Sequence, residues 1–183
     1  MGALVFTALS VLLVSSCSNS EGGRDYATPG ELCGISINPE DIEPFLPDGK
    51  SITVRETKYE TTDLCKVIVD NKVVATASIG WVEKGKATSY FAALNTLKTL
   101  KEVDEGGRYV YSGNEAFGKT RTCVDARYGQ ELYTGFQFWG DEHKDADAMR
   151  RIIGDYTNRV EKLPECTEGA FGQEESPSPT SWR

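Results

Sequence analysis

The sequence has few of the residues that build metal sites and catalytic triads. It contains one histidine, His143, in 183 residues. This excludes metal sites built on histidine pairs, and any Ser-His-Asp triad would depend on this one side chain. His143 lies in the acidic stretch 141–147 at the expected start of a helix, so we interpret it as a surface residue. The stretch lacks the spacing of an EF-hand, and its carboxylates suit the positive end of a helix. We therefore predict no catalytic residue, no metal and no cofactor.

Positive charge is also in short supply. The chain has 20 lysine and arginine residues against 28 aspartate and glutamate residues, and its formal net charge is −8. An acidic domain repels the phosphate backbone of DNA and RNA. The composition therefore excludes nucleic acid as an expected partner.

Cysteines that lie close together are absent as well. Cys33, Cys65, Cys123 and Cys166 are at least 32 residues apart, whereas zinc sites need close pairs such as C-x2-C. These are four of the five cysteines in the chain, the fifth being Cys17 near its start. An even number remaining in an exported chain predicts two disulfides instead. Of the three possible connectivities we favour Cys33–Cys65 with Cys123–Cys166, one for each half of the domain. The alternative is Cys33–Cys166 with Cys65–Cys123.

No hydrophobic run is long enough to span a bilayer as a helix. The apolar run from Ala3 to Val14 falls short of the roughly 20 residues required, and fits the apolar region of a signal peptide. The residues that follow, Val14-Ser15-Ser16-Cys17, resemble the bacterial lipobox, whose cysteine is acylated and becomes the new N-terminus. The sequence therefore predicts a lipid on Cys17 that holds the protein on the outer face of the cell membrane. The alternative is an ordinary secretory signal in which Cys17 is incidental, and the uncharged start of the chain departs from both patterns.

The chain divides into four segments on this basis. Residues 1–16 are the expected lipoprotein signal peptide, and the polar, glycine-rich residues 17–31 are an expected flexible tether. One domain follows over residues 32–166, a length that suits a single core. Residues 167–183 alternate serine with proline and are expected to be disordered.

The domain is expected to contain two copies of one strand-strand-strand-helix unit, at about 50–101 and 108–163. The copies align without a gap when Cys65 is placed on Cys123. Strands and helices in this order predict an α+β fold. We expect an antiparallel sheet of about six strands with the helices on one face. Hydrophobic patterning predicts a first strand that begins at Ile52 and five further strands at 65–69, 72–81, 109–111, 119–127 and 131–139. It also predicts helices at 87–100 and 143–160. A short helix that Asn38 caps should precede both copies.

The last predicted strand contains the candidate binding site. Its alternation conflicts with that of the first copy, which leaves Tyr133, Gln137 and Trp139 on the opposite side from the expected core. An exposed tyrosine and tryptophan with an amide between them form a plausible binding patch. The alternatives are a bulge near Gly135 that shifts the register, or a sheet that is covered on both faces.

One resemblance bears on function. Cys33 before the first helix, the segment Phe45-Leu46-Pro47-Asp48-Gly49, a mid-chain cysteine on a strand and a cysteine at the end of the last helix resemble small actinobacterial lipoproteins of unknown function. The resemblance implies the same membrane location and no known activity. We expect a membrane-anchored binding domain for an envelope protein or a small ligand. The alternative is a cell-envelope hydrolase or transferase that uses carboxylates such as Asp125 or Glu131.

Overall fold

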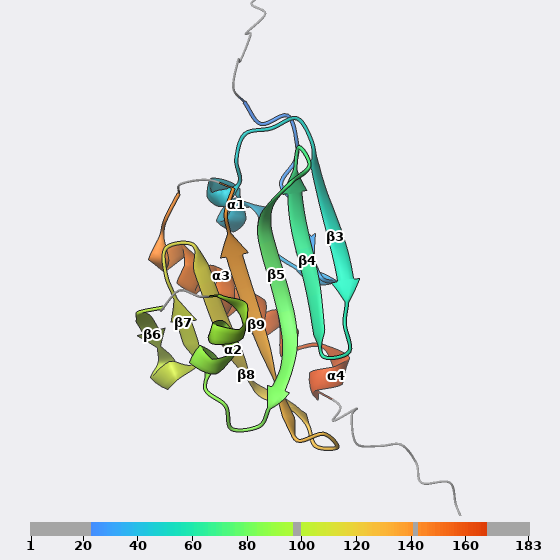
Figure 1. Ribbon diagram of the computed structural model, residues 1–183, viewed down its shortest axis with the longest axis vertical. Coiled ribbons are helices and arrows are strands. Elements are labelled where there is room, and N and C mark those ends of the chain that lie inside the picture. Colours follow the sequence, from blue (N-terminus) through green and yellow to red (C-terminus); the bar gives the residue numbers. More distant parts are fainter. Residues whose placement is uncertain (1–22, 97–99, 141–142, 168–183) are drawn as a thin grey trace, which may run out of the picture.

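Seven antiparallel strands form one sheet in the computed structural model, which describes residues 23–96, 100–140 and 143–167 (Figure 1). Their order across the sheet is β3-β4-β5-β9-β8-β7-β6. The strands are β3 Ile52–Lys58, β4 Thr62–Val69, β5 Lys72–Glu83, β6 Glu102–Asp104, β7 Tyr109–Tyr111, β8 Glu115–Asp125 and β9 Gln130–Phe138. The α+β class and the large antiparallel sheet are confirmed. The sequence pattern missed β6, a three-residue edge strand whose one apolar residue, Val103, is exposed.

Two long hairpins make up the centre of the sheet. Asp70 and Asn71, which separate the predicted strands 65–69 and 72–81, form the β4–β5 turn with φ angles of 46° and 68°. Gly129 has a φ of 62° in the turn between β8 and β9. The hairpins meet where β5 pairs with β9, from Ala75 opposite Phe138 to Glu83 opposite Gln130.

Short elements surround the sheet. The helices are α1 Pro39–Ile42, α2 Thr88–Asn95, α3 Ala146–Val160 and α4 Pro164–Thr167, with 3-10 turns at Glu43–Phe45 and Glu105–Gly107 and a separate β-ribbon of β1 Glu31–Leu32 and β2 Ile35–Ser36. Asn38 caps α1 by accepting a hydrogen bond from the backbone of Glu40, as predicted. The expected helix over 87–100 ends earlier, because the chain is extended at Thr96. Leu94, near the end of α2, is 63% exposed.

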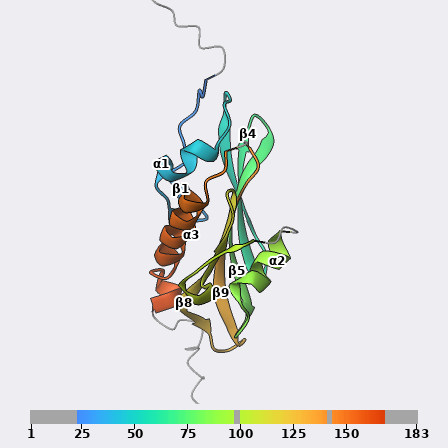
Figure 2. The ribbon, with the colours of Figure 1, turned by 90° about the vertical axis from the view of Figure 1, so that its left-hand side faces the viewer.

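The helices lie on opposite faces of the sheet, so the expectation that they share one face is wrong. Figure 2 shows α3 on one side and α2 on the other. The α3 side holds the larger core, which contains Phe136, Phe138 and Tyr156. The α2 side holds a second core, in which Phe91 packs against Phe117 and Tyr133 with ring centroids 5.9 and 5.4 Å apart. Both alternating sets of residues on β9 are therefore buried.

The two-repeat architecture is not confirmed. The gapless alignment matches Ala77 with Gly135, but in the sheet Ala77 pairs with Phe136 and faces the α3 core. Gly135 faces the other side, against Phe117. The register of β8 against β9 shifts between Lys119 and Val124. Because of this irregularity, and because their helices lie on opposite faces of the sheet, the two halves differ in structure.

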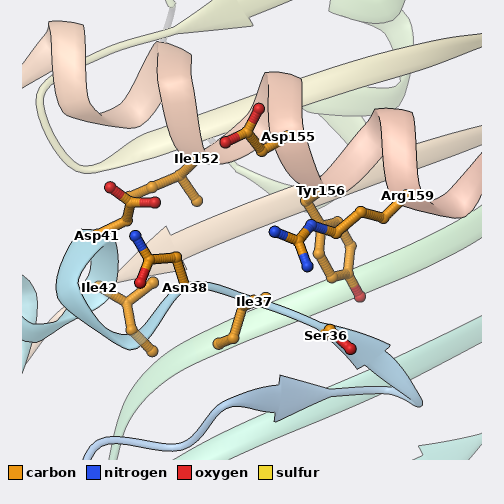
Figure 3. Close-up of a pocket in the computed structure, with 9 residues that line it drawn as sticks. All are labelled: Ser36, Ile37, Asn38, Asp41, Ile42, Ile152, Asp155, Tyr156 and Arg159. Carbon is orange, nitrogen blue, oxygen red and sulfur yellow. The ribbon is translucent and has the colours of Figure 1, made fainter.

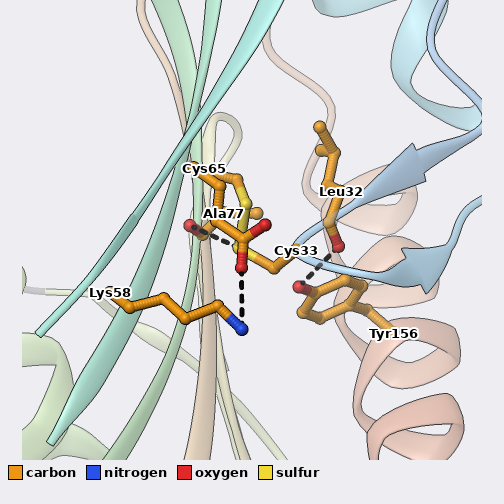
Figure 4. The surroundings of a disulfide bond; sticks show 7 residues. Leu32, Cys33, Lys58, Cys65, Ala77 and Tyr156 are labelled. Atoms are coloured by element: carbon orange, nitrogen blue, oxygen red, sulfur yellow. Dashed lines mark hydrogen bonds and ion pairs between the residues drawn. A yellow bond between two sulfur atoms is a disulfide. The ribbon is translucent and has the colours of Figure 1, made fainter.

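The favoured disulfides are present. Cys33–Cys65 joins the turn of the β1–β2 ribbon to β4, beside a hydrogen bond of 3.3 Å from the Tyr156 hydroxyl to the Leu32 carbonyl (Figure 4). Cys123–Cys166 joins β8 to α4. Both bonds hold peripheral segments against the α3 side, where Cys65, Cys123 and Cys166 belong to the core.

The chain joins the domain earlier than the sequence indicated. Arg24 forms a β-bridge with Gly49 and donates to the Leu46 carbonyl at 2.6 Å, and the Tyr26 hydroxyl donates to the Pro47 carbonyl. Residues 24–31 are therefore not part of a flexible tether. Cys17 and the predicted signal peptide lie outside the described residues, as does the predicted tail beyond Thr167. Within the described part of the chain, no helix is both long and apolar enough to cross a membrane.

Candidate functional site

The predicted patch of Tyr133, Gln137 and Trp139 does not form a common exposed surface. Tyr133 is fully buried beneath α2, and its hydroxyl donates to the Lys86 carbonyl at 2.6 Å. Gln137 is 9% exposed and its amide donates to the Asn95 carbonyl at the end of α2. The expectation of a shared open face is wrong for both residues, because a helix covers this face as well.

The sequence did contain a signal for this second core. A Cβ atom on Gly80 would lie 2.9 Å from the Phe91 ring, and one on Gly135 would lie 2.8 Å from the Phe117 ring. Glycines on one side of two neighbouring strands let aromatic rings approach the backbone. Small residues at these positions therefore indicate a covered sheet face.

Trp139 is the one residue of the three that stays accessible. It is 49% exposed directly after β9, and its backbone N–H donates to the Val74 carbonyl at 2.7 Å. The next residue, Gly140, lies against Val74 and Pro47. Trp139 is therefore at the end of the sheet where the chain from Cys17 joins the domain.

A crevice between α1 and α3 is too small for a ligand. Figure 3 shows Asn38 and Ile42 on one side of it, and Ile152 and Tyr156 on the other. Its volume of about 10 Å³ is enough for at most one water molecule. The crevice is therefore not a candidate binding site.

A larger hollow lies at the opposite end of the sheet from the point where the chain joins. Its volume is about 660 Å³. The β5–α2 connection, the 3-10 turn before β7, and strands β8 and β9 contribute its walls. The lining residues are Lys86, Ala87, Thr88, Glu105, Gly106, Gly107, Arg108, Lys119, Thr120, Arg121 and Glu131.

An ion pair between Lys119 and Glu131 forms one wall of the hollow. The Lys119 ammonium is 2.6 Å from the Glu131 carboxylate, which also accepts from the Gly85 N–H at 2.8 Å. Burial alone would raise the pKa of Glu131, but these two hydrogen bonds outweigh it and the pKa is lowered. Burial likewise would lower the pKa of Lys119, but Glu131 and Tyr133 raise it. Both groups are therefore held in their charged forms at neutral pH.

Two arginines share one carboxylate on the other wall. Glu105 lies 2.7 Å from the guanidinium of Arg121 and 3.3 Å from that of Arg108. Arg108 is nearly buried and is held further by Glu161 and by the Lys119 carbonyl. The Arg121 side chain is 61% exposed. Arg108 is therefore a fixed part of the wall, and Arg121 is the accessible one.

The other charged residues singled out in the sequence have local structural roles. Asp125 accepts hydrogen bonds from the backbone of Arg127 and Tyr128 in the β8–β9 turn. His143 is exposed and contacts the edge of Phe45. Asp145 caps α3 by accepting from the Ala148 N–H. The described residues contain no cluster of potential metal ligands.

The hollow thus gathers charged side chains from segments far apart in the chain, and of these only Glu131 had been a candidate for chemistry in the sequence. The other lining residues gave no local signal, since their proximity depends on how β8 and β9 meet the β5–α2 connection. Comparisons of the chain with protein families, with curated proteins and with solved structures find no match.

Proposed function

We propose that this protein is a lipid-anchored binding domain on the outer face of the cell membrane. The lipobox-like segment Val14-Ser15-Ser16-Cys17 supports the anchor, and the two disulfides are typical of exported proteins. The resemblance to small actinobacterial lipoproteins agrees with this location and stays a prediction.

The observation that carries a binding function is the position and content of the hollow. The chain joins the domain beside the start of β5, where Arg24 pairs with Gly49, and the hollow lies beside the end of β5 and the connection that follows it. A strand of 12 residues is about 40 Å long. Cys17 is seven residues from Arg24, a stretch that spans at most about 25 Å. The domain is then held close to the membrane by one end, and the opposite end has a site with convergent charged side chains.

The charge states favour recognition over catalysis. A general acid or base works best with a pKa near the operating pH. The pKa of Glu131 is lowered and that of Lys119 is raised, so neither is suited to exchange a proton at neutral pH. Asp125 is occupied in a turn. The alternative of a carboxylate-based hydrolase or transferase therefore has less support than a binding function.

Mass spectrometry of the mature protein tests the anchor. We expect the N-terminal peptide to begin at Cys17 and to carry acyl chains, and we expect the Cys17→Ala protein to be released or left unprocessed. A mature N-terminus at any other residue of membrane-extracted protein would contradict the anchor.

Photo-cross-linking on intact cells tests the binding site. A photoreactive amino acid at Ala87, in the lining of the hollow, should cross-link to a component of the envelope. The matched control is the same substitution at Ala93, which is exposed on the same helix outside the lining. Equal cross-linking at both positions, or none at Ala87, would remove the hollow as the binding site.

A further inference from the structure

The lining of the hollow is rich in positive charge although the whole chain is acidic. Four cationic side chains line it, with two carboxylates, in a protein of net charge −8. The cations are Lys86, Arg108, Lys119 and Arg121. Glu83 and Glu161 pair with Lys86 and Arg108 from outside the lining. Two of the carboxylates that balance these four cations, Glu105 and Glu131, belong to the lining, and the other two, Glu83 and Glu161, lie outside it.

The first turn of α2 faces the same space. Lys86, Ala87 and Thr88 all belong to the lining. Ala87 occupies the N-cap position of α2 and supplies no side-chain hydrogen bond. An N-terminus without a side-chain cap leaves backbone N–H groups that suit a negatively charged acceptor.

Two of the four cations are accessible enough to contact a ligand. The side chains of Arg121 and Lys86 are 61% and 38% exposed. Arg121 shares Glu105 with Arg108, so one carboxylate faces two guanidinium groups at this wall. The planar guanidinium of Arg121 has N–H donors beyond the one that contacts Glu105, and such donors suit a carboxylate or a phosphate.

From this arrangement we propose that the ligand of the hollow carries an anionic group, a carboxylate or a phosphate, that contacts Arg121, Lys86 and the first turn of α2. The inference rests on the proposed function, since it names the ligand chemistry of the same site. Lys119 and Arg108 contribute to the local potential, and their ion pairs with Glu131 and Glu105 keep them in place.

An NMR titration of the full mature protein in detergent micelles tests this assignment. Inorganic phosphate and acetate are added in separate experiments at constant ionic strength. We expect saturable shifts of the backbone amides of Ala87, Thr88 and Arg121. The anion that gives the tighter binding identifies the source of the negative charge as phosphate or carboxylate.

Two variants with the same change in charge separate a specific site from a general effect. Arg121→Gln should weaken binding by about tenfold, which is typical for the loss of a hydrogen bond between charged groups. Arg55→Gln removes a positive charge from exposed β3, outside the lining, and should leave the affinity unchanged. Equal weakening in both variants, or the absence of saturable shifts with either anion, would overturn the proposal.

A failure of the anion proposal can be told apart from a failure of the proposed binding function by combining the titration with the cross-linking experiment. Cross-linking at Ala87 together with no anion binding would leave a binding site for a ligand of other chemistry. Anion binding without cross-linking at Ala87 would leave a site that is not used in the envelope.

Discussion

Phe138 and Trp139 are neighbours in sequence that differ sharply in burial, and their replacement by alanine tests the register of β9. Phe138 is 2% exposed and stacks on Phe45 with ring centroids 4.6 Å apart. Its loss should cost about 3–5 kcal/mol of unfolding free energy. Trp139 is 49% exposed, so folding removes about 125 Å² of a side chain of about 250 Å² from water. At about 25 cal/mol per Å², and with a reduction for the compact unfolded state, its loss should cost about 2 kcal/mol.

Thermal unfolding with the disulfides intact measures this difference. For a protein of this size, 1 kcal/mol corresponds to about 3 °C in Tm. Phe138→Ala should therefore lower Tm by about 12 °C, and Trp139→Ala by about 6 °C. The backbone hydrogen bond from Trp139 to Val74 is kept in both variants. A larger loss in Trp139→Ala than in Phe138→Ala would refute the register, because it would place the tryptophan in the core.

Four further predictions concern stability. Replacement of both cysteines of either disulfide by alanine should lower the free energy of unfolding by about 4 kcal/mol, given sequence separations of 32 and 43 residues. Urea unfolding measures this loss, and a much smaller loss would contradict the prediction. Glu131 has a folded pKa below its ordinary value of 4.5, so its contribution is present above that value and is lost as the pH falls through the folded pKa. Unfolding of Glu131→Gln at a series of acidic pH values should show a weaker loss of stability than the unchanged protein. Tyr133→Phe should cost only about 1 kcal/mol in urea unfolding, since the Lys86 carbonyl still accepts from Lys119. Gly135→Ala should cost about 1–3 kcal/mol in the same assay, because the added Cβ would lie 2.6 Å from the Ser78 Oγ, and an unchanged midpoint would argue against this close approach.

Local patterns predicted the elements well, for reasons that belong to short stretches of chain. The alternation from Val73 to Trp81 predicted most of β5, and the turn at Asp70 and Asn71 falls between the predicted strands 65–69 and 72–81. The period of Met149, Ile152, Ile153, Tyr156 and Val160 predicted α3, and all five residues are buried. The favoured disulfide pairing was confirmed, although the spacing alone had left three choices.

The candidate site was much less predictable. The alternation of β9 indicated that Tyr133 and Gln137 face away from the α3 core, which is correct, but it did not show that α2 covers them. Period-2 patterning tells which residues share a face and says nothing about what packs on that face. The hollow has no sequence signature for the same reason, since Lys86, Glu105 and Arg121 come from separate segments.

The sequence by itself determined where strands and helices form and which cysteines were available to pair, because backbone propensity and hydrophobic period act over a few residues. The tertiary structure decided that α2 and α3 lie on opposite faces of the sheet, and this buried Tyr133 and left Trp139 half-exposed. It also brought the charges of the hollow together at the end of β5. These outcomes depend on long-range packing and on the shift of register between β8 and β9, whose energies are shared by residues far apart in the chain.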